Sequence, residues 1–339
     1  MSVKEDVLKL LEQKKGIYIS GEEIAKELNV SRTAVWKAVN TLNEEGYSIS
    51  GINKLGYCLN TGTDILSVEG ILRELPNEQK DKFDIRIYKT VSSTNTLLKK
   101  MASEGEAEWT VVLAKEQTEG KGRMNRKFYS PSDTGIYMSI LLRPDFAATE
   151  SLFITTMAAV AVAEGIDDIL HTDTKIKWVN DIYQNDKKVC GILTEASINV
   201  ENAKLEYAVL GIGINVKEPK TEFPEEIRHI AGSLGGEKLS DEKSDNLRNR
   251  LIADILVRIY NYYLRLDRHE FMSKYKEKSM LIGKEVYILS DKEQKGLQVL
   301  DIDENAALVV QDFEGNIQHI SSGEVSVRLK QPKNEFGLI

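Results

Sequence analysis

The first 60 residues carry the hydrophobic pattern of short amphipathic helices followed by a hairpin. Apolar positions at helical spacing predict helices around residues 7–11 and 24–28, and a third over 32–43 with Ser31 as its N-cap. Over residues 47–59 the apolar positions alternate instead, and a turn separates two short runs. Three short helices followed by a hairpin predict a winged helix-turn-helix.

Residues 66 to 216 have a mixed pattern of helices and strands. Helices are predicted after Thr94 and over Ser151–Leu170. Several apolar runs have the length and composition of strands: residues 85–88, 110–114, 136–142, 188–195 and 207–211. Because some of these strands follow one another without an intervening helix, the pattern favours a mixed or largely antiparallel sheet over a doubly wound one.

The last third of the chain shows a helix and then a series of strands. A helix rich in Leu, Ile and Tyr is predicted from the charged segment near Asp241 to about Tyr275. Short strands separated by polar turns follow from Glu285 to Arg328 and predict a small barrel of the SH3-like type. The whole pattern is that of an α+β multidomain protein, with domains at residues 1–63, 64–280 and 281–339.

The composition is that of a soluble globular protein with a net negative charge. The chain has 339 residues, enough for two or three domains, of which 41% are hydrophobic and only 6 are proline. The formal net charge is -8, so any binding of DNA, phosphate or an anionic membrane must come from a local basic patch.

The sequence gives no sign of export, of a disulfide scaffold or of a metal site. Cys58 and Cys190 have no neighbouring Cys or His at metal-ligand spacing. The N-terminus is charged and lacks the apolar core of a signal peptide. The most apolar stretch, Leu152–Ala163, is too short to cross a bilayer. We therefore expect a cytoplasmic protein with no membrane partner and no metal ligands of its own.

The third predicted helix has one polar face that suits contact with DNA. Arg32, Thr33, Trp36, Lys37 and Asn40 fall outside its apolar face. Lysine can contact phosphate, asparagine can read a base edge, and arginine can do either. The alternative is a winged helix used for protein contact, and the equal numbers of basic and acidic residues in the first 60 positions favour it. DNA binding is the hypothesis that the helix pattern supports, with a dimer on a two-fold site.

A basic, glycine-containing loop stands out in the acidic chain. The segment Gly120–Lys127 holds two glycines and four cations: Lys121, Arg123, Arg126 and Lys127. Glycines let backbone amides turn toward an anion, and the cations supply charge-assisted donors. Phosphate or nucleotide contact is one interpretation and a solvated basic turn is the other. The loop lacks the spacing of a Walker A motif.

Further motifs lie on both sides of this loop. They are Ser92–Asn95 before a predicted helix, Gln117, Lys177–Asp181, Lys188–Glu195 and Gly211–Asn215. Each has an ordinary alternative, since Ser93 or Thr94 would serve as an N-cap and the lysines as surface cations. The last motif lacks the third glycine and the following helix of a dinucleotide fold.

Taken in order, these motifs resemble the biotin-protein ligase family. The series runs Ser-Ser-Thr-Asn, Glu-Gln-Thr-Glu-Gly-Lys-Gly-Arg, Lys-Trp-x-Asn-Asp, Lys-x-x-Gly-Ile-Leu-x-Glu and Gly-Ile-Gly-Ile-Asn. With a winged helix in front and a small barrel behind, the resemblance covers nearly the whole chain. It points to the bifunctional type, in which a biotin ligase is also the biotin operon repressor.

The resemblance implies a two-step reaction that uses ATP and biotin, with Mg²⁺ accompanying the nucleotide. Biotin is activated to biotinyl-5′-AMP and then transferred to a lysine of the biotin carboxyl carrier protein of acetyl-CoA carboxylase. The implied catalytic residues are Lys188, Arg123 and Asp181. Lys188 would bridge the biotin carboxyl and the α-phosphate, and Asp181 would orient or help to deprotonate the incoming amine.

The resemblance also assigns the binding residues. The biotin site would comprise Ser93, Thr94, Asn95, Gln117, Lys121, Gly122, Arg123 and Lys188. The nucleotide site would comprise Arg123, Arg126, Lys127, Lys177, Asn180, Asn215 and Arg328. Three positions depart from the family pattern: Lys121 replaces a common arginine, Asn125 a glycine and Val179 a proline. Lys121 keeps the positive charge of that arginine but lacks its bidentate fork.

The implied partners are operator DNA, the carrier protein and, once the adenylate is bound, a second copy of the chain. Two other functions remain open on the sequence. One is a transcription factor that senses biotin but has lost catalysis, and the other is a lipoate-protein ligase. The retained Lys188, Asp181 and Arg123 argue against the first, and the winged helix and the basic loop are unexplained by the second.

Overall fold

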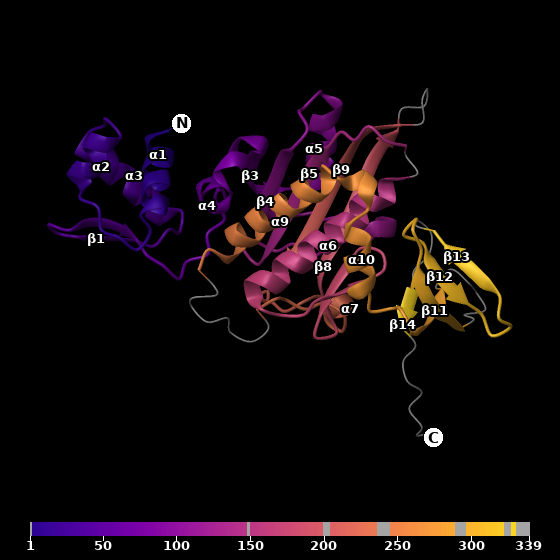
Figure 1. Cartoon of the computed structure of the whole chain (residues 1–339). Helices are drawn as coiled ribbons and strands as arrows, with labels where there is room; N and C mark the ends of the chain where they lie inside the picture. The colour runs from indigo at the N-terminus through magenta and orange to yellow at the C-terminus, as the bar shows by residue number, and fades with distance from the viewer. Residues whose placement is uncertain are drawn as a thin grey trace, which may run out of the picture.

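The computed structural model describes residues 2–147, 150–198, 204–235, 245–288, 296–321 and 327–329, and begins with a winged helix-turn-helix (Figure 1). Its elements are α1 (Val3–Gln13), α2 (Gly21–Glu27), α3 (Arg32–Glu44), β1 (Ile49–Ile52) and β2 (Gly56–Leu59). Ser31 caps α3, since its hydroxyl accepts a hydrogen bond from the Ala34 amide at 3.1 Å. The prediction of three helices and a hairpin is confirmed.

A seven-stranded mixed sheet forms the centre of the molecule. Its strands are β3 (Asp84–Val91), β4 (Thr110–Gln117), β5 (Gly135–Leu142), β6 (Lys175–Lys177), β7 (Asp181–Gln184), β8 (Lys187–Ile198) and β9 (Leu205–Asn215). Their order is β3-β4-β5-β9-β8-β7-β6, in which β3 and β4 run parallel and the other neighbours antiparallel. The expected mixed sheet is confirmed.

Helices cover both faces of this sheet (Figure 1). α5 (Thr94–Ser103) packs on one face through Leu98 and Ala102, while α6 (Ser151–Leu170) and α9 (Leu247–Tyr263) pack on the other. Val111 and Leu113 of β4 join the core on the α6 and α9 face, whereas Val112 joins the core under α5, because the side chains of a strand alternate between faces. The short helices are α4 (Val68–Glu74), α7 (Glu225–Arg228) and α10 (Phe271–Glu277). None of the helices in the described ranges is long and apolar enough to cross a membrane.

The prediction of a single helix that continues to about Tyr275 is wrong. α9 ends at Tyr263, a 3-10 turn covers Leu266–Arg268, and α10 starts at Phe271. His269 adopts a left-handed conformation between them, with φ of 48°. This break lets Phe271 and Tyr275 turn into the core, which a straight continuation of α9 would not allow.

The C-terminal strands form an open antiparallel sheet. They are β10 (Glu285–Ile288), β11 (Gly296–Ile302), β12 (Leu308–Gln311), β13 (Ile317–Ile320) and β14 (Val327–Leu329), in the order β13-β12-β11-β10-β14. A closed barrel would require the edge strands β13 and β14 to pair, and over the described residues they do not. The expected SH3-like barrel is therefore not confirmed. The Trp178 indole N–H donates to the Ala306 carbonyl at 2.9 Å and joins this sheet to the central one.

A buried carboxylate fixes the junction between the winged helix and the central region. Asp64 accepts from the Arg248 Nε at 3.0 Å and lies 2.9 Å from the Lys217 Nζ. The side chains of Asp64 and Arg248 are each 3% exposed. Burial raises the pKa of Asp64, but the positive charges of Arg248 and Lys217 outweigh it and hold the pKa below its ordinary value. One carboxylate thus holds the linker, the start of α9 and the chain that leaves β9.

Candidate active site and nucleic-acid interface

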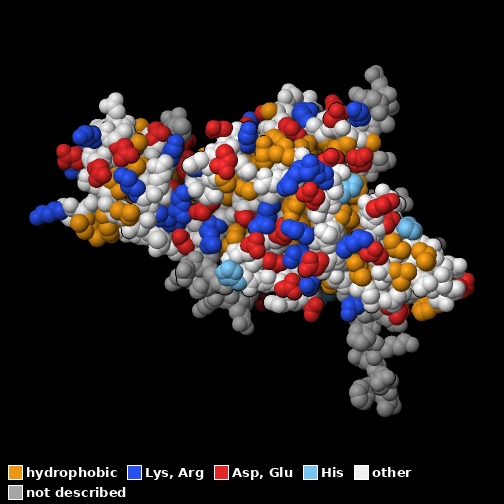
Figure 2. Space-filling model, viewed as in Figure 1, with side chains coloured by type: hydrophobic (Ala, Val, Ile, Leu, Met, Phe, Trp, Pro, Cys, Tyr) orange, Lys and Arg blue, Asp and Glu red, His pale blue; other side chains and the backbone are white. Residues whose placement is uncertain are grey.

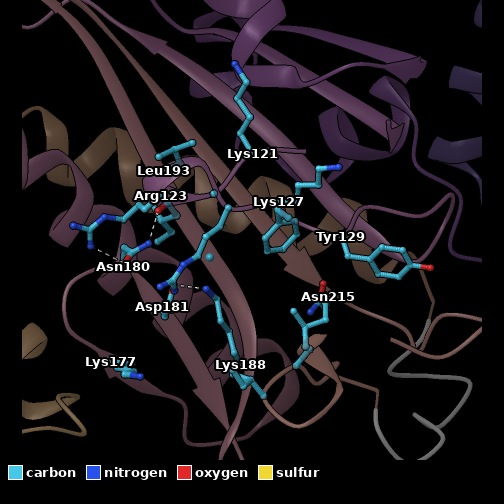
Figure 3. Close-up of a pocket in the computed structure, with 18 of the residues that line it drawn as sticks. Lys121, Arg123, Lys127, Tyr129, Lys177, Asn180, Asp181, Lys188, Leu193 and Asn215 are labelled. Carbon is cyan, nitrogen blue, oxygen red and sulfur yellow. Dashed lines mark hydrogen bonds and ion pairs between the residues drawn. The ribbon is translucent and has the colours of Figure 1, made fainter. Parts of the chain in front are cut away.

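A cavity of about 260 Å³ opens beside the ends of β7, β8 and β9 (Figure 3). Three segments contribute most of its lining: the basic loop 121–129, the residues from Lys177 to Tyr183, and the segment 223–231. Lys188 and Asn215 complete it. The structure therefore brings together motifs that lie up to about a hundred residues apart in the sequence.

Lys188 and Asp181 form the ionic centre of this cavity. The Lys188 Nζ lies 2.7 Å from the Asp181 Oδ1 across the antiparallel β7 and β8 (Figure 3). The segment 230–232 holds the Lys188 backbone along one edge of β8, because the Lys188 amide donates to the Ile230 carbonyl at 2.8 Å and its carbonyl accepts from the Gly232 amide at 3.0 Å. The ammonium group is thus positioned by the sheet and by the segment that covers the cavity.

Arg123 reaches the same place from the basic loop. Its guanidinium donates to the Asn180 Oδ1 at 3.2 Å, and Asn180 donates in turn to the Ile192 carbonyl at 2.7 Å. Burial lowers the pKa of Arg123 and the charge of Asp181 opposes that change. An arginine remains charged under these conditions, so a fixed cation faces the cavity.

The basic loop forms a closed turn although Asn125 stands at a position where glycine is common. Met124 and Asn125 have φ of 54° and 59°, in the left-handed region that asparagine tolerates well. The Gly122 amide donates to the Arg126 carbonyl at 2.7 Å, and the Phe128 amide to the Gly120 carbonyl at 2.8 Å. The departure at Asn125 is compatible with a closed turn.

The remaining cations predicted at the nucleotide site have different positions. Arg126, Lys127 and Lys177 all line the cavity, and the Lys177 ammonium lies 5.7 Å from the centre of the Tyr183 ring. Arg328 occupies β14 opposite Tyr287, but its side chain lies outside the described part of the structure. Its expected contact with the nucleotide stays a prediction.

A second, smaller cavity of about 30 Å³ adjoins the first. Its lining includes Ser93, Thr94, Asn95, Gln117 and Lys121, and it shares Phe128 and Leu193 with the larger cavity. Gly122, Arg123 and Lys188 line only the larger one. The residues predicted for biotin are therefore divided between two adjoining spaces.

The Ser92–Asn95 motif does more than begin a helix. Ser93 stands at the N-cap of α5 and is 2% exposed, yet its side chain makes no capping hydrogen bond. Thr94 donates from its amide to the Gln117 Oε1 at 2.8 Å, and the Thr94 Oγ1 lies 3.1 Å from the same atom. The N-cap alternative does not account for these side chains.

Two glycines of the Gly211–Asn215 motif make room for neighbouring side chains. A Cβ on Gly211 would lie 2.2 Å from the Asn95 Oδ1, and a Cβ on Gly213 would lie 2.6 Å from the Phe128 ring. The motif is thus a packing surface under the smaller cavity. This role depends on which strand passes beneath α5, which no local pattern reveals.

The sequence-based reasoning missed Ser139 and Ser130. Ser139 lies in β5 and is 0% exposed, with its Oγ 2.6 Å from the Asn95 Oδ1 and 2.8 Å from the Thr94 Oγ1. Ser130 accepts from the Gln117 Nε2 at 2.9 Å. A lone polar residue within the apolar run Ile136–Leu142 was the signal that would have identified Ser139.

The winged helix presents the predicted reading face to solvent. Arg32, Thr33, Trp36 and Lys37 are exposed, Trp36 by 54%, and Asn40 is half-buried. A groove runs between this face of α3 and the β1–β2 hairpin, and Lys54 at the hairpin turn is one of its lining residues. Figure 2 shows hydrophobic side chains gathered over the hairpin, where Ile52 and Leu55 are exposed by 45% and 54%. The exposed aromatic and apolar groups mark this face for a partner.

Comparison with known proteins agrees with this architecture. Residues 87–215 match the Biotin/lipoate A/B protein ligase family, and residues 3–58 match an HTH domain. The chain is 36% identical over 270 residues to the bifunctional ligase/repressor BirA of Bacillus subtilis, covering 80% of this chain and 81% of that one. It is 27% identical over 323 residues to BirA of Escherichia coli, covering 92% and 94%.

A solved structure extends the similarity to the arrangement in space. The biotin protein ligase from Aquifex aeolicus in complex with biotin and ATP superposes with a TM-score of 0.61 at 29% identity. The match covers 73% of this chain and 99% of that one. The chain therefore belongs to the biotin/lipoate A/B protein ligase family, in its group of bifunctional ligase/repressors.

Proposed function

We propose that this chain is an ATP-dependent biotin-protein ligase and a biotin-dependent repressor. It activates biotin to biotinyl-5′-AMP, releases pyrophosphate, and transfers the biotinyl group to a lysine of the biotin carboxyl carrier protein. The observation that carries the proposal is the pair of Lys188 and Asp181 facing Arg123 in a cavity that adjoins the pocket of Ser93 to Gln117. The domain division at residues 63 and 280 belongs to the same proposal.

In the first step two anions must meet. A biotin carboxylate oxygen forms a bond to the α-phosphorus while the bond to pyrophosphate breaks. Lys188 and Arg123 offset the repulsion between these anions, and their fixed positions avoid reorganisation at the moment of reaction. In the second step the acceptor amine bonds to the acyl carbon and AMP leaves. Asp181 orients that amine and accepts its proton.

The lining of the cavity suits ATP without a dedicated metal site. Among the described residues no three His, Cys, Asp or Glu side chains gather as metal ligands, and Asp181 is the one acidic residue of the described cavity lining. Asp181 is already paired with Lys188. Mg²⁺ would therefore be held by the phosphate oxygens of the nucleotide, in keeping with its reluctance to shed water for protein ligands.

Biotin entry requires the basic loop to move. The smaller cavity, at about 30 Å³, is far smaller than the adjoining one of about 260 Å³, so a bicyclic ring needs the two spaces joined. The Phe128 ring stands between the two cavities and packs on Gly213. Displacing Phe128 and closing the loop Gly120–Lys127 over the adenylate would join the two spaces into one site.

The ligase activity has a direct test without any acceptor. Incubation with biotin and ATP labelled at the α-phosphate should give labelled biotinyl-5′-AMP that stays with the protein, and carrier protein should then release labelled AMP. Folded protein that binds biotin but forms no adenylate would instead indicate a sensor that has lost catalysis. Stabilisation by lipoate rather than biotin in thermal unfolding would indicate a lipoate ligase.

For the repressor, the adenylate would favour a homodimer through the central sheet and so place two α3 helices on a palindromic operator. Carrier protein that still lacks biotin would consume the adenylate and lift repression. A cytoplasmic location, where both partners are found, is part of this proposal.

The positive charge of Arg32 at the start of α3 should contribute to the salt dependence of the affinity for operator DNA. Replacing Arg32 with alanine is expected to lower the slope of log affinity against log salt by about one, because one phosphate contact is lost. Fluorescence anisotropy of labelled operator DNA at several salt concentrations measures this slope. Lys4, which lies on α1 and pairs with Glu45 at 2.6 Å, is the control, and an equal loss in Lys4→Ala would contradict the assignment.

A further inference from the structure

A continuous chain of hydrogen-bonding side chains lies behind the pocket of Ser93 to Gln117. It runs from Glu195 on β8 through Asn95 on α5 and Ser139 on β5 to Thr94, which lines the pocket. Asn95, Ser139 and Thr94 are 4%, 0% and 4% exposed. Buried polar groups at such positions have no water to satisfy them, so the order of donors and acceptors is fixed by the chain itself.

The acidic end of the chain sets the orientation of Asn95. The Asn95 Nδ2 donates to the Glu195 Oε2 at 3.0 Å and to the Leu193 carbonyl at 3.3 Å. Both partners can only accept, so the amide nitrogen must face them and the Oδ1 must face Ser139. Gly211, opposite Ser139 in the neighbouring strand, leaves the space that Asn95 fills.

The orientation passes from Asn95 to the pocket. The Asn95 Oδ1 only accepts, so the Ser139 hydroxyl donates to it at 2.6 Å. The Thr94 hydroxyl donates to the Gln117 Oε1 at 3.1 Å, and its oxygen lies 2.8 Å from the Ser139 Oγ, which is the donor of that pair. A lone pair of the Thr94 hydroxyl remains for a ligand that donates an N–H.

We propose that Glu195 and Ser139 are positioning residues for biotin, which make Thr94 an acceptor for a ureido N–H and so select biotin over acids without a ureido ring. This inference rests on the proposed function. In this scheme Asn95, which also lines the pocket, acts through Ser139 and Thr94, because both hydrogens of its amide are engaged.

The surroundings of Glu195 keep it in the accepting form. Burial raises the pKa of Glu195, but the hydrogen bonds from Lys99 and Asn95 and the charges of Lys99 and Lys121 outweigh it, so the pKa lies below its ordinary value. The Lys99 Nζ lies 2.8 Å from the Glu195 Oε1. An ionised carboxylate cannot donate a hydrogen bond. The series of hydrogen bonds therefore cannot run in the reverse direction, with Glu195 as donor to Asn95.

The test compares Ser139→Ala and Glu195→Gln with the wild-type chain in steady-state transfer of biotin to carrier protein. Ser139→Ala is expected to raise the KM for biotin about ten-fold, the value of one ordered hydrogen bond, with kcat and the KM for ATP unchanged. Glu195→Gln keeps the shape and one acceptor, so its KM for biotin should rise by less. Because Glu195 is half-buried, its replacement should perturb the packing less than a change at the fully buried Ser139.

Thr194→Val is the matched control. Thr194 is the neighbour of Glu195 on β8, and its hydroxyl lies 2.7 Å from that of Thr155 on the other face of the strand. The inference is overturned if Ser139→Ala leaves the KM for biotin unchanged, raises that for ATP equally, or behaves like Thr194→Val. A wild-type chain that forms no adenylate would show that the proposed function itself is wrong, and the inference with it.

Discussion

Replacing Lys188 with alanine is expected to slow adenylate formation by about 100- to 1,000-fold, the usual cost of one preorganised donor at a developing charge. Lys188 is the cation that the sheet and the segment 230–232 hold in the cavity from both sides. Its loss removes the cation that lies beside Arg123 at the meeting point of the two substrate anions and leaves Asp181 without its ionic partner at 2.7 Å. The effect should therefore fall on kcat more than on the affinity for biotin.

Release of pyrophosphate measures this step directly. Lys89→Ala is a suitable control, because Lys89 is an exposed lysine on β3 of the same sheet and lies outside the described lining of either cavity. A turnover unchanged by Lys188→Ala would show that the assigned role of Lys188 is wrong. A similar loss in both variants would point to a general effect of charge.

Replacing Asp64 with alanine is expected to lower the free energy of unfolding by about 3 to 5 kcal/mol, the cost of leaving a buried charge unpaired. Arg248 would keep its charge at 3% exposure and retain only the longer ion pair with Asp133 at 3.7 Å. Lys217, which follows β9, would also lose its contact at 2.9 Å. The variant should therefore weaken both the fold and the connection between the cavity and the winged helix.

Urea unfolding followed by far-UV circular dichroism measures the loss. Because the pKa of Asp64 is lowered on folding, its contribution is present at neutral pH and disappears as the pH falls through the folded-state pKa, so the difference between variant and wild type should shrink in acid. Asp145→Ala removes an exposed pair with Lys204 and should have no measurable effect. Equal effects of the two substitutions would contradict the account.

Local patterns in the sequence predicted the elements whose cause is local. Ser31 and the apolar face of residues 32–43 were sufficient for α3, and the continuous apolar stretch was sufficient for α6. The basic loop was found because it concentrates four cations in an acidic chain, whereas Lys188 was singled out by the family resemblance. Their common position in one cavity required the resemblance of the ordered motifs to a known family.

Features that depend on packing between distant segments were not predicted. Ser139 acquires its importance from α5 lying across β5, and Asp64 from a partner 184 residues away. The break at His269 follows from burial of Phe271 and Tyr275, since the helical pattern alone continues through it. The open C-terminal sheet differs from the expected barrel because strand spacing in a sequence does not specify which edges pair.

A gel-shift titration with DNA from upstream of the biotin operon tests the central claim most directly, namely that one chain links ligase chemistry to repression. The protein is titrated alone, with biotin and ATP, and with biotin, ATP and carrier protein. We predict a shifted complex that forms at much lower protein concentration with biotin and ATP, and that is lost when carrier protein consumes the adenylate. A complex whose affinity is the same in all three mixtures would contradict the account.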